Sequence, residues 1–272
     1  MKTFTGVEYL KIDIANCFGL DRLNWMDRLY WVDTNNHQLK DLACNAKHPV
    51  LYRKGLRALR IVEKGLPTNH IMGLDATASG IQLMAAISGC HTTAATCNLI
   101  NTGQREDVYA SVATHMNQVS GLSFTRNDIK QPLMTVVYGS TEQPKQIFGE
   151  GEELIVFYDT IKERIPGAWK LLQLFMKYWD SYAEYHSWTL PDGHVAKVPV
   201  VEVMEKKLEI DEEDHMRFTY RASVVTSKRK SRSLPANIIH SIDGWVVRQM
   251  VQAANKQGFW MAPVHDCSIR AV

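Results

Sequence analysis

The sequence contains no paired cysteine motif. Its five cysteines are odd in number and scattered, and no two of them form a Cys-x-x-Cys pair. This pattern argues against a disulfide framework and against a structural zinc site, and it is typical of proteins in a reducing cytosol. The cysteines are Cys17, Cys44, Cys90, Cys97 and Cys267.

Long apolar runs and a large excess of one charge are also missing. No run of 18 apolar residues occurs and no basic and apolar leader opens the chain, so we expect neither a membrane span nor secretion. The net charge is only +2, so affinity for nucleic acid would have to come from local clusters. The sequence also has no internal repeat. Its 272 residues can bury one large core or two smaller ones.

The stretch from Thr125 to Ser140 combines two cations, an aromatic residue and a glycine. On a helix, Arg126 and Lys130 lie one turn apart and point the same way. Tyr138 falls two turns further along roughly the same face, and Gly139 follows where the helix would end. This stripe suits a triphosphate with a sugar and base stacked behind it. A solvated basic helix with a core tyrosine fits the pattern about as well.

Two carboxylates are predicted at the ends of short strands. Residues 71–74 form an apolar run of strand length that ends at Asp75, and residues 259–264 form another that leads to His265 and Asp266. Magnesium takes carboxylates, backbone carbonyls and substrate phosphates as ligands, and two ions can act together in phosphoryl displacement. Taken alone, Asp75 could instead cap the turn that follows it.

The segment between these motifs is rich in strand signals and then in positive charge. Residues 195–224 predict one long hairpin with an acidic tip at 211–214. A helix should begin at Pro235, and His240 lies one residue off its apolar face, where it could face a cleft or simply pack as a neutral side chain. The basic run before that helix is usually a solvated loop, but beside a nucleic-acid channel it would neutralise phosphates. Its members are Lys228, Arg229, Lys230 and Arg232.

Together these sites occur in the order of motifs A, B and C of right-hand polymerases. The chain most closely resembles the single-subunit DNA-directed RNA polymerase family of bacteriophages and mitochondria. The segments that carry the resemblance are Leu-Asp75-Ala-Thr-Ala-Ser-Gly-Ile-Gln, the Arg126, Lys130 and Tyr138-Gly139 helix, Val-His265-Asp266, residues 9–17, Asp107-Val-Tyr109, Leu190-Pro-Asp-Gly193 and residues 235–244.

The resemblance implies a two-metal centre. Asp75 and Asp266 would bind two magnesium ions, helped by the carbonyl of Ala76, and His265 would sit beside the catalytic carboxylate. Asp75, Asp266, Lys130 and Tyr138 are the expected catalytic residues.

It also implies a nucleotide site and contacts with nucleic acid. Arg126 and Lys130 would bind the phosphates, and Tyr138 would close behind the incoming base and sense its sugar. Gly139 would let the template backbone approach, and His240 would touch the primer end or the 2′-hydroxyl. Contacts with nucleic acid are expected from His265, Tyr109, Lys228, Arg229, Lys230 and Arg232.

Two positions favour ribonucleotides under this resemblance. Related DNA polymerases carry a glutamate five residues after the motif A aspartate, and its bulk excludes a 2′-hydroxyl. Here that position is Gly80, so nothing is expected to fill the space. Four residues after Lys130, where those enzymes have an aromatic residue, stands Met134.

The implied fold is α+β and mainly helical, with a right-hand polymerase palm (a small antiparallel sheet) and fingers helices. The expected domains are palm entry and motif A over 1–90, fingers with the motif B helix over 91–187, a hairpin resembling the family's specificity loop over 188–234, and palm with motif C over 235–272.

The chain also departs from the family. The family's Asp-x-x-Gly-Arg motif does not precede Asp75, there is no room for an amino-terminal domain or a thumb, and the chain stops six residues beyond Asp266. The strand that pairs with motif C is therefore expected to be missing. We expect the catalytic subunit or a fragment of a split phage polymerase, working in the bacterial host cytoplasm without contact with a membrane.

A second polymerase subunit would supply the amino-terminal and thumb elements. The other expected partners are a DNA template, an RNA product and ribonucleoside triphosphates. The alternatives are a family A-like DNA polymerase, a primase, or a non-catalytic DNA-binding remnant.

Overall fold

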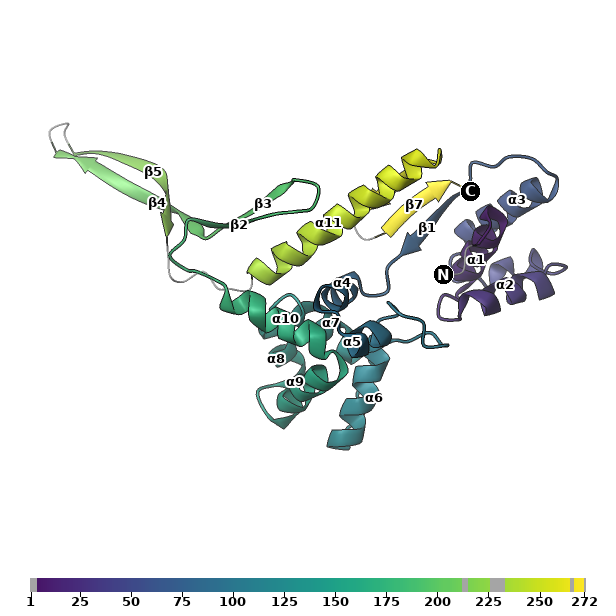
Figure 1. Cartoon of the computed structure of the whole chain (residues 1–272), viewed down its shortest axis with the longest axis horizontal. Coiled ribbons are helices and arrows are strands. Elements are labelled where there is room, and N and C mark those ends of the chain that lie inside the picture. The colour runs from purple at the N-terminus through teal and green to yellow at the C-terminus, as the bar shows by residue number, and fades with distance from the viewer. Residues whose placement is uncertain (1–3, 212–214, 226–232, 265–266, 272) are drawn as a thin grey trace. The chain divides into compact units, whose positions relative to one another are not determined.

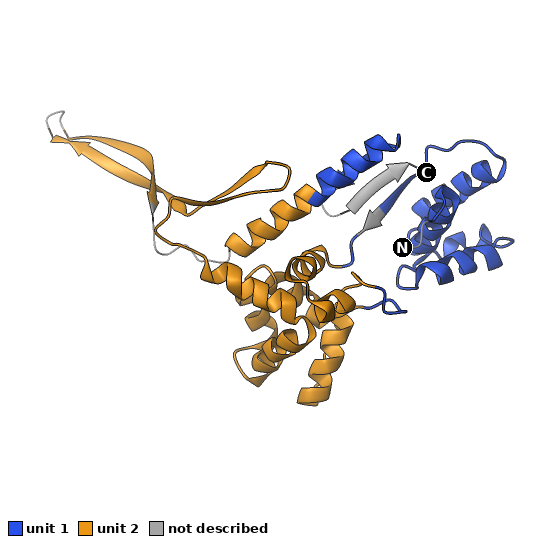
Figure 2. Cartoon of the chain, in the orientation of Figure 1, with its two compact units in different colours: residues 1–77, 101–106, 246–272 blue, residues 78–100, 107–245 orange. Residues whose placement is uncertain are grey.

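The computed structural model describes residues 4–211, 215–225, 233–264 and 267–271. The chain divides into two compact units (Figure 2). The first unit comprises residues 1–77, 101–106 and 246–272, and the second comprises residues 78–100 and 107–245. Over the described ranges the chain is mostly helical with small antiparallel sheets (Figure 1), which confirms the predicted α+β, mainly helical class.

Helices in the amino-terminal part of the first unit form one core. Thr5 caps the first helix in a capping box with Glu8, and Gly19 ends it in the left-handed conformation at φ 118°. The core residues of these helices include Leu10, Ile14, Tyr52, Leu56 and Leu59. The helices are α1 (Gly6–Phe18), α2 (Trp25–Thr34), the short 3₁₀ helix η1 (Asp41–Cys44) and α3 (Pro49–Glu63).

A three-stranded sheet in the first unit joins distant parts of the sequence. Its strand order is β1-β7-β6, and both pairings are antiparallel. The expectation that no strand pairs with the strand before His265 was wrong, because β7 follows at once and pairs with it. The five residues of β7 pair with β1 on one side and with β6 on the other. The strands are β1 (Ile71–Asp75), β6 (Met261–Val264) and β7 (Cys267–Ala271).

Helices around a second core form most of the second unit. Asp107 caps α6, and Gly121 ends it in the left-handed conformation at φ 70°. The largest fully buried core side chains are Met84, Met116, Ile129, Leu133, Phe157, Ile161 and Ile165. The helices are α4 (Ser79–Ser88), α5 (His91–Thr96), α6 (Val108–Ser120), α7 (Arg126–Val136), α8 (Glu142–Phe148), α9 (Glu152–Arg164) and α10 (Pro166–Lys177).

Two hairpins replace the single hairpin predicted over 195–224. The first pairs β2 (Tyr185–Thr189) with β3 (Val195–Pro199), and the second pairs β4 (Val201–Ile210) with β5 (Met216–Val225). The break falls at Val200, which is fully buried and donates its N–H to the carbonyl of Glu184. Figure 1 shows the second hairpin as a long twisted ribbon.

The last helix is α11 (Ser233–Lys256), which begins two residues before the predicted start at Pro235. In this helix Ile239 is buried, whereas Met250 and Ala253 are exposed. Among the residues that the structure describes, no helix is both long and apolar enough to cross a bilayer.

Candidate functional site

The end of β1 carries the first predicted metal ligand. Asp75 is the last residue of β1, as predicted, and its Cα lies opposite that of Cys267 in the ladder. Cys267 also pairs with Val264, the last residue of β6. The last residue of β1, the last residue of β6 and the first residue of β7 therefore lie at the same end of one sheet.

Of the other residues of the predicted metal centre, the structure describes only Ala76. His265 and Asp266 lie outside the described residues, so their predicted roles stay predictions. They occupy the connection between β6 and β7 in the sequence, next to Cys267. Ala76 follows β1 directly and is partly buried. A pair of carboxylates with a neighbouring backbone carbonyl is an oxygen donor set of the kind that magnesium prefers.

Local sequence fixes the start of the predicted phosphate-binding helix. Thr125 is the N-cap of α7, and the Asp128 carboxylate accepts hydrogen bonds from the Thr125 N–H and hydroxyl at 2.8 and 2.7 Å. These bonds lower the pKa of Asp128. Arg126 occupies the first turn and is partly exposed, and Lys130 is exposed one turn later.

Arg126 contacts Asp107, the N-cap of α6, and Tyr109 in the first turn of that helix. Its Nε donates to Asp107 Oδ2 at 2.5 Å, and its guanidinium carbon lies 5.2 Å from the centre of the Tyr109 ring. Burial raises the pKa of Asp107, but hydrogen bonds from Arg126 and from the Ala110 and Tyr109 amides outweigh it and lower the pKa overall. The ion pair with Asp107 is made through the Nε of Arg126.

Tyr109 is a core residue as well as a contact of Arg126. Its ring is only 5% exposed and belongs to the core of the second unit. The predicted contact between Tyr109 and nucleic acid stays a prediction, but the buried ring supports Arg126 directly. The resemblance gave the Asp-x-Tyr motif, whereas the Asp107–Arg126 ion pair was not predicted. An aspartate just before an apolar helix was the available signal for its capping role.

Three predicted nucleotide-site residues meet in the second unit. The rings of Tyr138 and His240 lie 4.9 Å apart, centre to centre, although their residues are about a hundred positions apart in sequence. A Cβ at Gly80 would come within 2.9 Å of the Tyr138 Cζ and closer still to its hydroxyl. The expectation that nothing fills the space beside Gly80 was therefore wrong, because the Tyr138 phenol occupies it.

The turn after α7 explains the glycine next to Tyr138. The helix ends at Val136, so Tyr138 lies in the following turn and not on the helix itself. Gly139 has φ 87°, which a residue without a Cβ adopts easily, and it donates its N–H to the Val136 carbonyl at 2.8 Å. A cavity of about 430 Å³ opens beside Gly139 and is also lined by Tyr158, Trp169 and Lys162.

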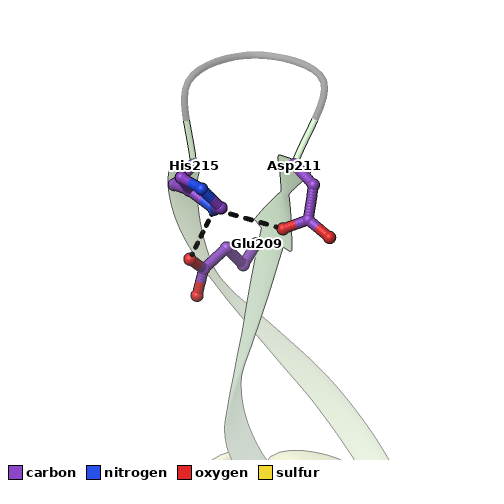
Figure 3. Close-up of side chains that lie close together, drawn as sticks. All are labelled: Glu209, Asp211 and His215. Carbon is purple, nitrogen blue, oxygen red and sulfur yellow. Dashed lines mark ion pairs between the residues drawn. The ribbon is translucent and has the colours of Figure 1, made fainter.

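The predicted basic cluster lies outside the described residues, between the end of β5 and the start of α11. Its members are Lys228, Arg229, Lys230 and Arg232. At the far end of the β4–β5 hairpin, His215 Nδ1 lies 3.3 Å from a carboxylate oxygen of both Glu209 and Asp211 (Figure 3). These side chains are all exposed, and Glu209 also pairs with Arg217 at 3.0 Å.

Comparison with protein families gives one matching model, described as DNA-dependent RNA polymerase, over residues 66–150. This range includes β1, the Asp107–Arg126 pair and the Tyr138-Gly139 turn.

Several curated proteins are similar over most of the chain. A probable DNA-directed RNA polymerase of Neurospora crassa is 23% identical, and the DNA-directed RNA polymerase of Pseudomonas phage phiKMV is 22% identical. The chloroplastic/mitochondrial DNA-directed RNA polymerase 2 of Arabidopsis thaliana is 25% identical. Each alignment covers 96% of this chain, but only 37%, 40% and 32% of the Neurospora, phage and Arabidopsis proteins, respectively.

The chain thus spans less than half the length of these relatives. The alignment with the Neurospora protein extends over 336 positions, more than the 272 residues of this chain, so that relative carries additional residues within the shared region. The predicted resemblance is confirmed: over most of its length, the chain is related to the DNA-directed RNA polymerases of the phage and mitochondrial type.

Proposed function

We propose that this chain forms the catalytic part of a DNA-directed RNA polymerase, which adds ribonucleotides to an RNA 3′ end on a DNA template. The observation that carries this proposal is the register of the β1-β7-β6 sheet. Asp75 ends β1 opposite Cys267, the residue that directly follows Asp266. Asp75 and Cys267, about 190 positions apart in the sequence, are thereby partners at one end of the sheet.

The donor chemistry at this end of the sheet suits magnesium. Asp75, Asp266 and the Ala76 carbonyl would hold two Mg²⁺ ions. Bound there, the ions would acidify the RNA 3′-hydroxyl and neutralise charge on the triphosphate and the leaving pyrophosphate.

The chain's own residues would bind and orient the incoming nucleotide. The Arg126 guanidinium would offer its two Nη groups to the triphosphate while Asp107 holds Nε. Lys130 would add a point charge one turn along the same helix. Tyr138 would stack behind the base, and His240, whose ring lies against Tyr138, would contact the sugar or the primer end.

The contact between Gly80 and Tyr138 changes the argument for ribonucleotide choice. A side chain at position 80 would first collide with the Tyr138 phenol, so the glycine allows Tyr138 to pack there and no longer argues for free space beside a sugar. Met134, exposed on α7, stands where an aromatic residue would mark the related DNA polymerases. Of these two positions, only Met134 therefore favours RNA synthesis.

The palm and fingers assignments follow from these roles. The sheet of the first unit would belong to the palm, and α7 with its neighbouring helices would belong to the fingers. We also propose that the chain works together with a second polypeptide of the polymerase. The DNA template would run beside the β4–β5 hairpin and the basic residues at 228–232.

The test is extension of a preformed RNA primer on single-stranded DNA by the chain together with its copurifying partner. With Mg²⁺, we expect incorporation of ribonucleotides in preference to deoxyribonucleotides. Asp75→Asn and Asp266→Asn should abolish extension and leave template binding intact. Asp33→Asn, at the exposed ion pair with Lys11, is the matched control and should keep full activity.

Other results would favour the alternative functions. Preferential use of deoxyribonucleotides would indicate a DNA polymerase, and synthesis without a primer only of short oligomers would indicate a primase. If the wild-type assembly extends no primer with either substrate but still binds DNA, the chain is a non-catalytic DNA-binding protein.

A further inference from the structure

A buried histidine–aspartate pair lies directly before β1 and takes no part in the chemistry proposed above. His70 Nε2 lies 2.9 Å from Asp13 Oδ2, and the two side chains are 4% and 16% exposed. Asp13 belongs to α1, whereas His70 immediately precedes Ile71, the first residue of β1. The pair therefore joins helix α1 to the start of the strand that ends at Asp75.

The His70 ring lies where two helices approach closely. A Cβ at Gly55 of α3 would come within 2.8 Å of Ile14 Cγ1 and 4.0 Å of His70 Cε1. Ile14 follows Asp13 on α1, so the ring is enclosed by α1 and α3. The His70 backbone N–H also donates to the Thr68 hydroxyl at 3.3 Å. Both the ring and the backbone of His70 are thus fixed.

Burial of the His70 ring costs free energy, because one of its nitrogen atoms has no hydrogen-bond partner within the part of the chain that the structure describes. His70 Nδ1 is buried without a hydrogen-bond partner among the described residues, and burial of an unpaired polar atom is unfavourable. An apolar side chain of similar volume often stabilises such a site as well or better, whereas a buried polar pair selects one arrangement of the elements it joins. The pair is therefore better suited to placing β1 than to stabilising the fold.

The strand it places has few other attachments. Within the described residues, β1 pairs along one edge only, with β7, and Met72 is 2% exposed. We propose that His70 and Asp13 are positioning residues that fix β1 and, through its backbone, set Asp75 for metal binding. This inference rests on the proposed function, because it requires the metal site at Asp75.

The experiment measures binding of Mn²⁺, a spectroscopic substitute for Mg²⁺, to the full-length chain by electron paramagnetic resonance. His70→Leu removes the hydrogen bond at similar volume, and we expect roughly tenfold weaker Mn²⁺ binding, as for supporting residues of other metal sites. His70→Gln places an amide N–H near the position of Nε2 and should restore most of the affinity. Hydrogen exchange of the amides of residues 71–75 should be faster in His70→Leu than in wild type.

A second histidine–carboxylate pair provides the matched control. His115 Nε2 lies 2.8 Å from Glu163 Oε2 in the second unit, between α6 and α9. His115→Leu should leave Mn²⁺ affinity and exchange in β1 unchanged. Thermal unfolding followed by circular dichroism identifies the folded variants, and Asp13→Ala replaces His70→Leu if the latter does not fold.

The possible outcomes separate this inference from the proposed function. The folded His70→Leu variant could bind Mn²⁺ as tightly as wild type and differ only in a lower unfolding temperature. That result would show that the pair only stabilises the fold, and it would overturn the inference. If the Asp75→Asn variant binds Mn²⁺ as tightly as the wild-type chain does, the proposed metal site is wrong, and the inference fails with it. Weaker Mn²⁺ binding in His70→Leu, with recovery of the affinity in His70→Gln, supports both the inference and the proposed metal site.

Discussion

At the scale of single residues, the proposed binding of a triphosphate by Arg126 would need little rearrangement of its side chain. A free arginine side chain loses considerable rotamer entropy when it binds phosphate. Here the Asp107 carboxylate and the Tyr109 ring hold the guanidinium in advance. Asp107 is itself fixed, since it accepts hydrogen bonds from the Tyr109 and Ala110 amides as the cap of α6. The cap of one helix thus orients the cation of the next.

Asp107→Asn should lower the free energy of unfolding at pH 7 by about 1 kcal/mol, a figure reduced for screening because the carboxylate is partly exposed. The folded-state pKa of Asp107 lies below its ordinary 3.8. Its contribution is therefore fully present above about pH 4 and is lost as the pH falls through the lower folded-state value. Urea unfolding of both proteins across this pH range measures the difference.

The control for this prediction is Asp159→Asn, which breaks the exposed ion pair with Lys162. Its stability should follow that of the wild type at every pH. A constant difference between Asp107→Asn and wild type from pH 7 to pH 2 would contradict the assigned role of the carboxylate.

At the scale of elements, the two hairpins differ in how they are anchored. In β2–β3, the Trp188 indole donates to the Ser241 hydroxyl of α11 at 2.8 Å, and Val198 is buried. The β4–β5 hairpin instead carries exposed ion pairs, such as Arg217–Glu209, and large exposed apolar side chains. These apolar residues include Leu208, Phe218 and Tyr220.

Replacement of residues 202–224 by a short Gly-Ser linker should therefore move the unfolding temperature of the remaining chain by less than about 2 °C. The hydrogen-bond ladder of β4 and β5 is internal to the hairpin, so its removal exposes little of the core. Differential scanning calorimetry gives the comparison. The matched deletion of residues 186–198 should destabilise the chain strongly, and equal shifts in both deletions would show that the two hairpins are anchored alike.

At the scale of the whole molecule, the near-neutral charge limits long-range attraction of DNA. With a net charge of +2, binding to the proposed DNA template would depend on local cations that displace counterions from phosphates. The densest such cluster in the sequence is the run from Lys228 to Arg232.

Changing Lys228, Arg229, Lys230 and Arg232 to glutamine should weaken template binding by the complete assembly and flatten its salt dependence. The slope of log affinity against log salt concentration should fall by roughly 0.9 for each phosphate contact that is lost. Fluorescence anisotropy at several salt concentrations measures it. Four exposed cations on α3, Arg53, Lys54, Arg57 and Arg60, provide a control of equal charge. An equal change in slope for both sets would exclude a specific role for the cluster.

Parts of the candidate site could be predicted because their signals are local. The strand ending at Asp75 follows from a short apolar run before a turn, and the start of α7 follows from its position after Gly121. The single hairpin prediction failed at Val200 because strand alternation continues through that residue. Its burial and its bond to Glu184 depend on contacts outside the strand.

The sequence by itself determined local features such as the end of β1 at Asp75 and the start of α7 at Arg126, because helix caps, apolar periodicity and glycine turns act over a few residues. Only the tertiary structure decided which distant residues meet: β7 between β1 and β6, Tyr138 against Gly80 and His240, and His70 against Asp13. Such contacts bring together residues far apart along the chain, and they form only where packing of whole elements offsets the entropy of closing the intervening loops.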